Sequence, residues 1–255
     1  GTGLADAIVI DALTGGYENN TLFRKISLSF PKGAFIALAG PNGSGKSSLL
    51  KFFYKQLKPE EGTIWVEKAD LATLKQEVLA QNIGFVPQNG RLDFSFTVEE
   101  TVAMGRYANP QKDDAKRIYR AMETCSILNL RNTPVTRISG GELQRTFLAR
   151  ALAQDGKILL LDEPVNHLDI AHQRSVMHLL QDLVAKGYTV IAVLHDLLLA
   201  QAYSSWIIFL KEGAVAADGP TGEVVNEEIL KSVYNVESHR IYDPHLDKEL
   251  LIPAW

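Results

Sequence analysis

The stretch that most constrains this chain is GPNGSGKSS at positions 40–48. A short apolar run of strand type, FIALA at 35–39, precedes it, and apolar residues at helical spacing follow it over 48–54. Glycine is costly to order, so a glycine-rich turn between a strand and a helix needs a reason. Gly40 and Gly45 bracket four residues and are followed by Lys46 and Ser47, which is the pattern of a phosphate-binding loop.

The chemistry of such a loop assigns a role to each part of the stretch. Its backbone N–H groups form a nest for anions, and the positive end of the following helix strengthens the nest. We expect Lys46 to reach the β- and γ-phosphates of a nucleotide and the Ser47 hydroxyl to bind Mg²⁺. The predicted nucleotide-binding residues of the loop are Gly40, Pro41, Asn42, Gly43, Ser44, Gly45, Lys46, Ser47 and Ser48.

Composition limits the remaining possibilities. The 255 residues suit one large α/β domain or two small ones, and the net charge of −4, without a basic stripe, argues against a nucleic-acid partner. A single cysteine, Cys125, excludes an internal disulfide and fits a reducing compartment. The sequence shows no signal peptide, and its apolar stretches fall far short of the roughly 20 residues that span a bilayer. A protein of this kind that serves a membrane is expected to lie on it.

The apolar pattern predicts an α/β fold with two kinds of sheet. Early strand-like segments around the loop predict a small antiparallel sheet, and later apolar strands that alternate with a helix predict a buried parallel sheet. The region 97–152 reads as helical and opens with a capping box of Thr97 and Glu100. Strands are predicted at 7–13, 25–30, 62–66, 83–86, 157–161 and 189–193, and helices at 170–186 and 227–234.

Three of these strands end in polar side chains. Asp162 and Glu163 follow an apolar strand, and charge at such a place is costly unless it is paired or metal-bound. We expect Asp162 to hold Mg²⁺ through water and Glu163 to orient the attacking water. His195 and Gln88 end their own strands, and in a phosphate site they would contact the γ-phosphate and Mg²⁺ respectively. The alternatives are a solvated strand end and a structural histidine.

A second helix start also suits an anion. In ISGGELQRTFLAR, Ser139 and Glu142 form a capping box, which could simply begin a core helix. Gly140 and Gly141 in the first turn leave its amides bare, however, and a bare helix start binds anions. One chain would then offer two phosphate-binding helix starts for one nucleotide. Two chains that face each other head to tail would use both.

The ordered set of these motifs resembles the ATP-binding subunit of an ABC transporter, and the resemblance covers nearly the whole chain. It implies that Ser139, Gly140, Gly141 and Glu142 form the signature motif that contacts ATP on the opposite subunit. It also implies that Asp169 belongs to the loop that couples the two sites. Tyr17 matches the aromatic residue that stacks on adenine, although an exposed loop aromatic is the alternative.

The same resemblance implies one ABC ATPase domain over residues 5–255. A core of the RecA-like phosphate-loop type with an antiparallel β subdomain would take 5–92 and 153–225, a helical signature subdomain 93–152, and a C-terminal extension 226–255. Two departures are Glu142, where many members have Gln, and Val165, where Thr is common. Neither removes a group that contacts phosphate or Mg²⁺. His167, His172 and His178 have no metal-ligand spacing, and we interpret them as solvated.

The segment TVEETVAMGRY at 97–107 resembles subunits that serve uptake of ferric siderophores, haem and vitamin B12. The implied protein is an ATPase on the cytoplasmic face of the cell membrane. Its implied partners are permease subunits, a second copy of itself and, indirectly, a substrate-binding protein. Alternatives are a zinc or manganese importer, a soluble ABC protein acting on ribosomes or DNA, and an exporter. The single ATP site and the absence of a long insert argue against the soluble class, and the lack of fused membrane helices argues against an exporter.

Overall fold

The computed structural model of the protein describes residues 5–88 and 95–255 and forms two compact units. One unit comprises the chain up to Thr73 together with residues 189–255, and the other comprises residues 74–188. In the described residues, no helix is both long enough and apolar enough to cross a membrane.

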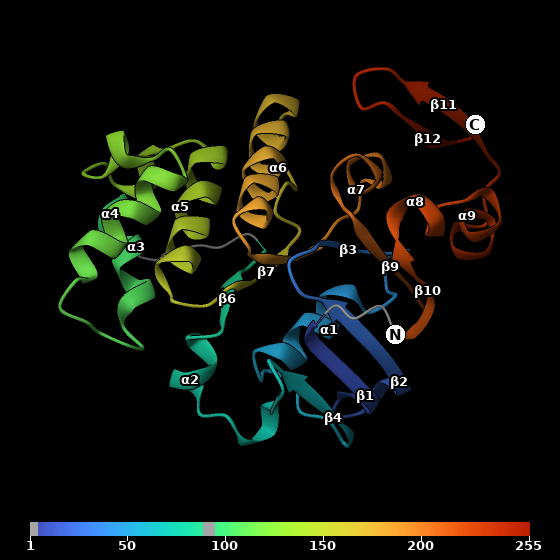
Figure 1. Ribbon diagram of the computed structural model, residues 1–255, viewed down its shortest axis with the longest axis horizontal. Coiled ribbons are helices and arrows are strands. Elements are labelled where there is room, and N and C mark those ends of the chain that lie inside the picture. The colour runs from blue at the N-terminus through green and yellow to red at the C-terminus, as the bar shows by residue number, and fades with distance from the viewer. Residues whose placement is uncertain (1–4, 89–94) are drawn as a thin grey trace. The chain divides into compact units, whose positions relative to one another are not determined.

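The first unit contains an antiparallel sheet with the strand order β2-β1-β4-β5 (Figure 1). Alternating side chains of β2 are buried, as expected for a strand with one face on a core. The register between β1 and β2 shifts around Ala12, whose φ of 50° marks a bulge. The strands are β1 (Asp6–Tyr17), β2 (Asn20–Pro31), β4 (Glu61–Val66) and β5 (Ala69–Asp70). The three predicted early strands are therefore confirmed, and the first two are longer than predicted.

The same unit contains a second set of strands. β3 (Phe35–Ala39) pairs in parallel with β8 (Thr189–Val193) on one side and with β9 (Trp206–Lys211) on the other. β10 (Ala214–Pro220) pairs antiparallel with β9. All side chains of β3 and β8 are buried, which explains why both read as unbroken apolar runs.

Helices and a hairpin complete the first unit. The Gln201 side chain donates to the Leu251 carbonyl at 3.0 Å and accepts from the Leu251 amide at 2.8 Å, and this pair anchors the C-terminal hairpin to α7. Arg240 pairs with Glu227 at 2.6 Å and ties the hairpin to α9. The elements are α1 (Lys46–Phe53), the 3₁₀ turn η1 (Leu71–Thr73), α7 (Leu197–Tyr203), α8 (Thr221–Val224), α9 (Glu227–Tyr234), β11 (Ser238–Asp243) and β12 (Lys248–Pro253).

The second unit joins a pair of parallel strands to a group of helices. β6 (Ile83–Val86) pairs in parallel with β7 (Ile158–Asp162), and α6 (Ile170–Ala185) follows β7. Helices α3, α4 and α5 pack together, as their green and olive ribbons show in Figure 1. The helices are α2 (Gln76–Ala80), α3 (Val98–Ala103), α4 (Asp114–Thr124) and α5 (Gly140–Ala153), with short 3₁₀ turns η2 (Met104–Arg106), η3 (Leu128–Leu130) and η4 (Val135–Arg137).

The predicted α/β class, with parallel strands and a separate antiparallel sheet, is confirmed. The capping box of Thr97 and Glu100 is present at the start of α3. The proposed subdivision of one domain stays a prediction, and its boundary at 92/93 lies outside the described residues.

Candidate functional site

The phosphate loop joins the end of β3 to the start of α1 in the first unit. Gly45 is the N-cap of α1 with a φ of 104°, and no side chain caps the helix there. Gly40 has a φ of 141°, and a Cβ at that position would lie 2.1 Å from the Leu210 carbonyl oxygen. Only glycine fits this combination of backbone conformation and close approach. The Ser44 hydroxyl is buried without a hydrogen-bond partner in the described residues, so the loop contains a polar group that a ligand could satisfy.

Lys46 folds back over this loop. Its side chain is buried, and Nζ donates to the Gly40 carbonyl and, at 3.4 Å, to the Pro41 carbonyl. A buried ammonium group is costly unless oxygens surround it. The two loop carbonyls therefore hold a positive charge at the start of α1, where phosphate oxygens would meet it.

Tyr17, the last residue of β1, lies beside the start of α1. Its hydroxyl is 3.0 Å from Ser48 Oγ and accepts a hydrogen bond from Lys51 Nζ at 3.0 Å. The hydrogen bond with Ser48 is the main cause that lowers the pKa of Tyr17 below its usual value, and Lys51 lowers it further. The structure thus brings Tyr17 to the helix that follows the phosphate loop, where the residue is 41% exposed and Lys51 Nζ lies 5.3 Å from the centroid of its ring.

A second tyrosine at the loop was not anticipated. Tyr234 is the last residue of α9, and its ring lies edge-on to Phe209 with centroids 6.1 Å apart. Burial raises the pKa of Tyr234 to about 12, and a hydrogen bond with the backbone of Gly40 opposes that shift. Because α9 is far from the loop in sequence, only the fold reveals this contact.

His195 belongs to the same unit as the phosphate loop. β8 runs parallel to β3, with Val193 paired with Leu38, and the Leu194 amide donates to the Leu38 carbonyl at 3.1 Å. His195 therefore follows the same end of the sheet from which the phosphate loop starts, which is where α/β folds present ligands. The His195 side chain is exposed, and the next residue caps α7.

The acidic pair lies at the end of β7 in the second unit. Asp162 is buried as the last residue of the strand, and Glu163 follows with a φ of 52°, a left-handed conformation that is strained for a residue with a side chain. Gln88 Nε2 donates to Glu163 Oε2, and Asn166 Nδ2 donates to the same oxygen at 3.1 Å. Two amides from different segments thus orient one carboxylate.

The structure brings Gln88 and Glu163, two of the predicted site residues, into direct hydrogen-bond contact. Asn166 was not predicted to belong to the site. The sequence spacing could have indicated it, because an amide three residues after a carboxylate can reach back across a tight turn.

The start of α5 is capped as expected, and the start of α6 is also capped. Ser139 Oγ accepts from the Glu142 amide at 3.2 Å, and Glu142 Oε1 accepts from the Ser139 amide at 2.9 Å. Gly140 and Gly141 form the first turn of α5. Asp169 caps α6, and the hydrogen bond from the His172 backbone is the main cause that lowers the pKa of this carboxyl.

His172 is partly exposed and also makes a contact that the sequence did not predict. His172 Nδ1 lies 2.9 Å from Asp169 Oδ1, because residues three apart at a helix start share one face. His167 and His178 are exposed, as predicted.

The expected site residues are therefore divided between the two units. The first unit holds Tyr17, the phosphate loop and His195. The second unit holds Gln88, Ser139, Gly140, Gly141, Glu142, Asp162, Glu163 and Asp169.

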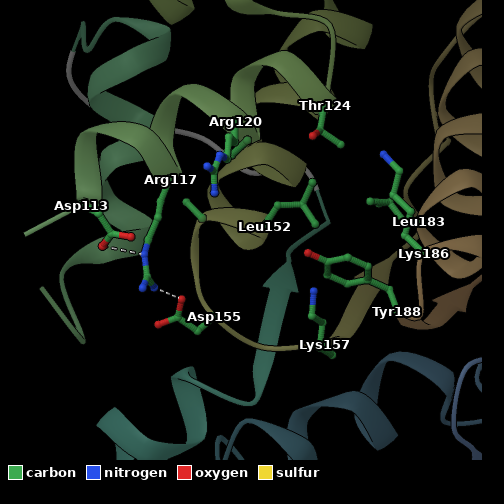
Figure 2. Close-up of a pocket in the computed structure, with 12 residues that line it drawn as sticks. Asp113, Arg117, Arg120, Thr124, Leu152, Asp155, Lys157, Leu183, Lys186 and Tyr188 are labelled. Atoms are coloured by element: carbon green, nitrogen blue, oxygen red, sulfur yellow. Dashed lines mark hydrogen bonds and ion pairs between the residues drawn. The ribbon is translucent and has the colours of Figure 1, made fainter. Parts of the chain in front are cut away.

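A hollow of about 430 Å³ in the second unit contains none of these residues (Figure 2). Arg120, Lys157 and Lys186 line it, and Arg117 is paired there with Asp113 and Asp155. Helices α4, α5 and α6 all end around it, and cations near helix C-termini offset the negative ends of the helix dipoles. Of the basic residues, Lys186 is the C-cap of α6 and Lys157 Nζ lies 4.2 Å from the centroid of the Tyr188 ring, so both have partners within the fold.

A glycine-rich loop between a parallel strand and a helix, with a buried lysine and an uncapped helix start, defines a phosphate-loop nucleoside triphosphatase. The sequence matches the ABC transporter family over residues 23–166, which is more than half of the chain. The chain belongs to the ABC transporter family and is its ATP-binding, ATP-hydrolysing component.

Two relatives are similar to this chain over most of their own length. The ferric enterobactin transport ATP-binding protein FepC of Escherichia coli K12 is 37% identical over 95% of this chain and 92% of its own. The hemin import ATP-binding protein HmuV of Rhodococcus jostii is 38% identical over 89% of this chain and 80% of its own. A solved structure described as an inward-facing conformation of a putative metal-chelate type ABC transporter has a TM-score of 0.84 and 27% identity, and 98% of each chain is covered.

Proposed function

We propose that this chain powers an importer of metal chelates, with a ferric siderophore as the first candidate substrate and haem as the second. The observation that carries the proposal is the 37% identity with a ferric enterobactin transport protein over almost all of both chains. We place the chain on the cytoplasmic face of the membrane, where it would drive separate permease subunits. No helix of the described residues could itself cross the membrane.

ATP binding is assigned to the first unit. The N–H groups of the loop and the start of α1 surround the phosphates, and Lys46 offsets their charge. Tyr17 stacks on the adenine ring, a contact of about 1–3 kcal/mol by analogy with other base–aromatic stacking.

Hydrolysis is assigned to the polar ends of the strands. On this proposal Ser47, Asp162 and Gln88 would each offer Mg²⁺ an oxygen ligand of the kind that it prefers, and the ion would neutralise charge on the β- and γ-phosphates. Glu163 orients the attacking water and accepts its proton. His195 contacts the γ-phosphate, and Gln88 links the Mg²⁺ ligands to Glu163 through the hydrogen bond already described.

Two copies of the chain are proposed to close on two ATP molecules. Each ATP is held by the phosphate loop of one chain and by Ser139, Gly140, Gly141 and Glu142 of the other, and Asp169 couples the two sites. The start of α5, with Gly140 and Gly141 in its first turn, supports this arrangement. It is a second helix start suited to phosphate, and a single chain with one nucleotide would leave it unused. Closure would move the helical regions of two chains against the permease, and an external substrate-binding protein would deliver the cargo. Nucleic acid has no role in this scheme.

The test is reconstitution with the cognate permease and binding protein, purified together with this chain. Transport into vesicles is measured separately with radiolabelled ferric siderophore, haemin, cobalamin, zinc and manganese, with Lys46→Ala as the inactive control. ATP-dependent uptake of a ferric siderophore or haemin supports the proposal. Uptake of zinc or manganese alone would assign the chain to the other class of importer.

A further inference from the structure

His172 connects the start of α6 to the start of α5. A Cβ placed on Gly141 would lie 2.4 Å from His172 Cδ2 and 2.8 Å from Cγ. Contacts this short do not occur between real atoms, so the imidazole ring occupies the space that any larger residue at position 141 would need. A side chain from another helix thus restricts position 141, the last residue of the Ser139-Gly140-Gly141 turn, to glycine.

The same imidazole ring is hydrogen-bonded to Asp169. Asp169 Oδ1 accepts from the His172 amide at 2.9 Å and lies 2.9 Å from His172 Nδ1. An ionised carboxylate only accepts hydrogen bonds, so Nδ1 must carry the proton in this contact. One carboxylate oxygen is therefore fixed by two donors of one residue.

A second contact joins the two helices one turn further along. Arg145 Nη2 on α5 donates to Ser175 Oγ on α6. Asp169 is 68% exposed and His172 is 40% exposed, so this linkage lies at the surface and does not serve a buried core. Ser139 and Gly140 are exposed as well, whereas Gly141 is buried.

We infer that His172 is a positioning residue that holds the Asp169 carboxylate and the Ser139-Gly140-Gly141 turn as one element. The inference rests on the proposed function, in which the Ser139-Gly140-Gly141 turn holds the partner's nucleotide and Asp169 couples the two sites. If the link is lost, each turn adjusts independently and the composite site forms in fewer encounters. Turnover then falls, whereas nucleotide affinity of the single chain does not change.

Two substitutions separate the roles of the ring and the hydrogen bond. His172→Phe keeps a ring against Gly141 but has no donor, and His172→Asn places an amide N–H near the position of Nδ1 but has no ring. Steady-state ATP hydrolysis of the purified full chain is measured at high protein concentration, with His178→Asn on the same helix as the matched control. We expect kcat to fall about tenfold for His172→Phe, which corresponds to about 1.4 kcal/mol in the activation barrier. For His172→Asn we expect kcat to fall by no more than about threefold, or about 0.6 kcal/mol.

The reverse order, with His172→Phe active and His172→Asn impaired, would show that the ring only fills space and would overturn the inference. Affinity for a fluorescent ATP analogue should be equal in all variants. If His172→Phe does not fold, His172→Ala, which also lacks the donor, replaces it in the comparison.

A double-mutant cycle tests whether His172 acts through Asp169. Asp169→Ser preserves a good N-cap for α6 but shortens the side chain. The double variant Asp169→Ser/His172→Phe should be no slower than the slower single variant, and multiplication of the two losses would overturn the inference.

A dimerisation assay distinguishes this inference from the proposed function. If a Glu163→Gln chain does not dimerise with ATP, both fail. If it dimerises but every variant at position 172 turns over like wild type, only the role of His172 fails.

Discussion

Glu163 combines a strained backbone with a tightly oriented side chain. Its φ of 52° costs on the order of 1–3 kcal/mol for a non-glycine residue, and such strain persists where neighbouring contacts over-determine it. Gln88 and Asn166 supply those contacts by donating to one carboxylate oxygen. In the proposed mechanism, a carboxylate held in this way would orient water without reorganisation during the reaction.

Asn166→Ala should therefore impair turnover and leave ATP binding intact. One hydrogen bond to a charged group contributes about 1.5–3 kcal/mol, so we expect kcat to fall about tenfold or more with an unchanged KM. Steady-state kinetics over a range of ATP concentrations give both values, and Asn129→Ala, an exposed asparagine of the same unit, is the control. A raised KM with normal kcat would remove Asn166 from the orientation of Glu163.

Residues of the site differed in how far the sequence could predict them. The phosphate loop and the Asp162–Glu163 pair are contiguous patterns with a physical reason, so they could be located in advance. Asn166, His172 and Tyr234 act through contacts that depend on turn geometry or on distant segments. Tyr234 in particular reaches Gly40 only because α9 folds back onto the strand that carries Phe209.

At the scale of elements, the start of a helix can be predicted from a few residues of local sequence. Thr97 Oγ1 accepts from the Glu100 amide at 3.1 Å, and the Thr97 amide donates to Glu100 Oε1 at 3.0 Å. Each contact satisfies an amide that the helix itself cannot satisfy. This reciprocal pair makes the start of α3 predictable from four residues of sequence.

Thr97→Ala should lower the free energy of unfolding by about 1 kcal/mol, since it removes the cap acceptor. Thr97→Ser retains the hydroxyl and should stay within a few tenths of wild type. Urea titrations followed by circular dichroism measure the difference between the two. Equal stability of both variants would mean that the capping box contributes nothing to α3.

Other elements could not be placed from sequence. The strand β9 is not among the predicted strands, and its position beside β3 depends on pairing across more than 160 residues. The bulge at Ala12 is also hidden, because alanine does not favour the positive φ that it adopts there. Periodicity predicts that an element exists, whereas its neighbours follow from the packing of the whole chain.

At the scale of the whole molecule, the buried thiol of Cys125 is expected to lower the free energy of unfolding at alkaline pH. Burial raises the pKa of Cys125 to about 12 from its ordinary value near 9. Between these values the folded chain keeps a proton that the unfolded chain loses. The free energy of unfolding therefore falls as the pH rises above about 9, with a slope of up to about 1.4 kcal/mol per pH unit from this group.

Cys125→Ala removes this titration. The variant should be less stable than wild type at pH 8, because it leaves a small cavity, but it should lose less stability between pH 8 and pH 10.5. Thermal unfolding at both pH values measures the two losses. Parallel losses in wild type and variant would contradict the assignment of alkaline sensitivity to this thiol.

The central claim is that ATP joins two copies of this chain through a composite site and that hydrolysis by Glu163 releases them. Glu163→Gln should reduce turnover by roughly 10²- to 10⁴-fold without loss of ATP binding, because only the water-orienting group changes. The direct measurement is the molar mass of Glu163→Gln by light scattering at high protein concentration, with ATP and with ADP. We predict twice the chain mass of 28.1 kDa with ATP and the single-chain mass with ADP. A single-chain mass with saturating ATP, together with normal turnover of Ser139→Arg, would contradict the account.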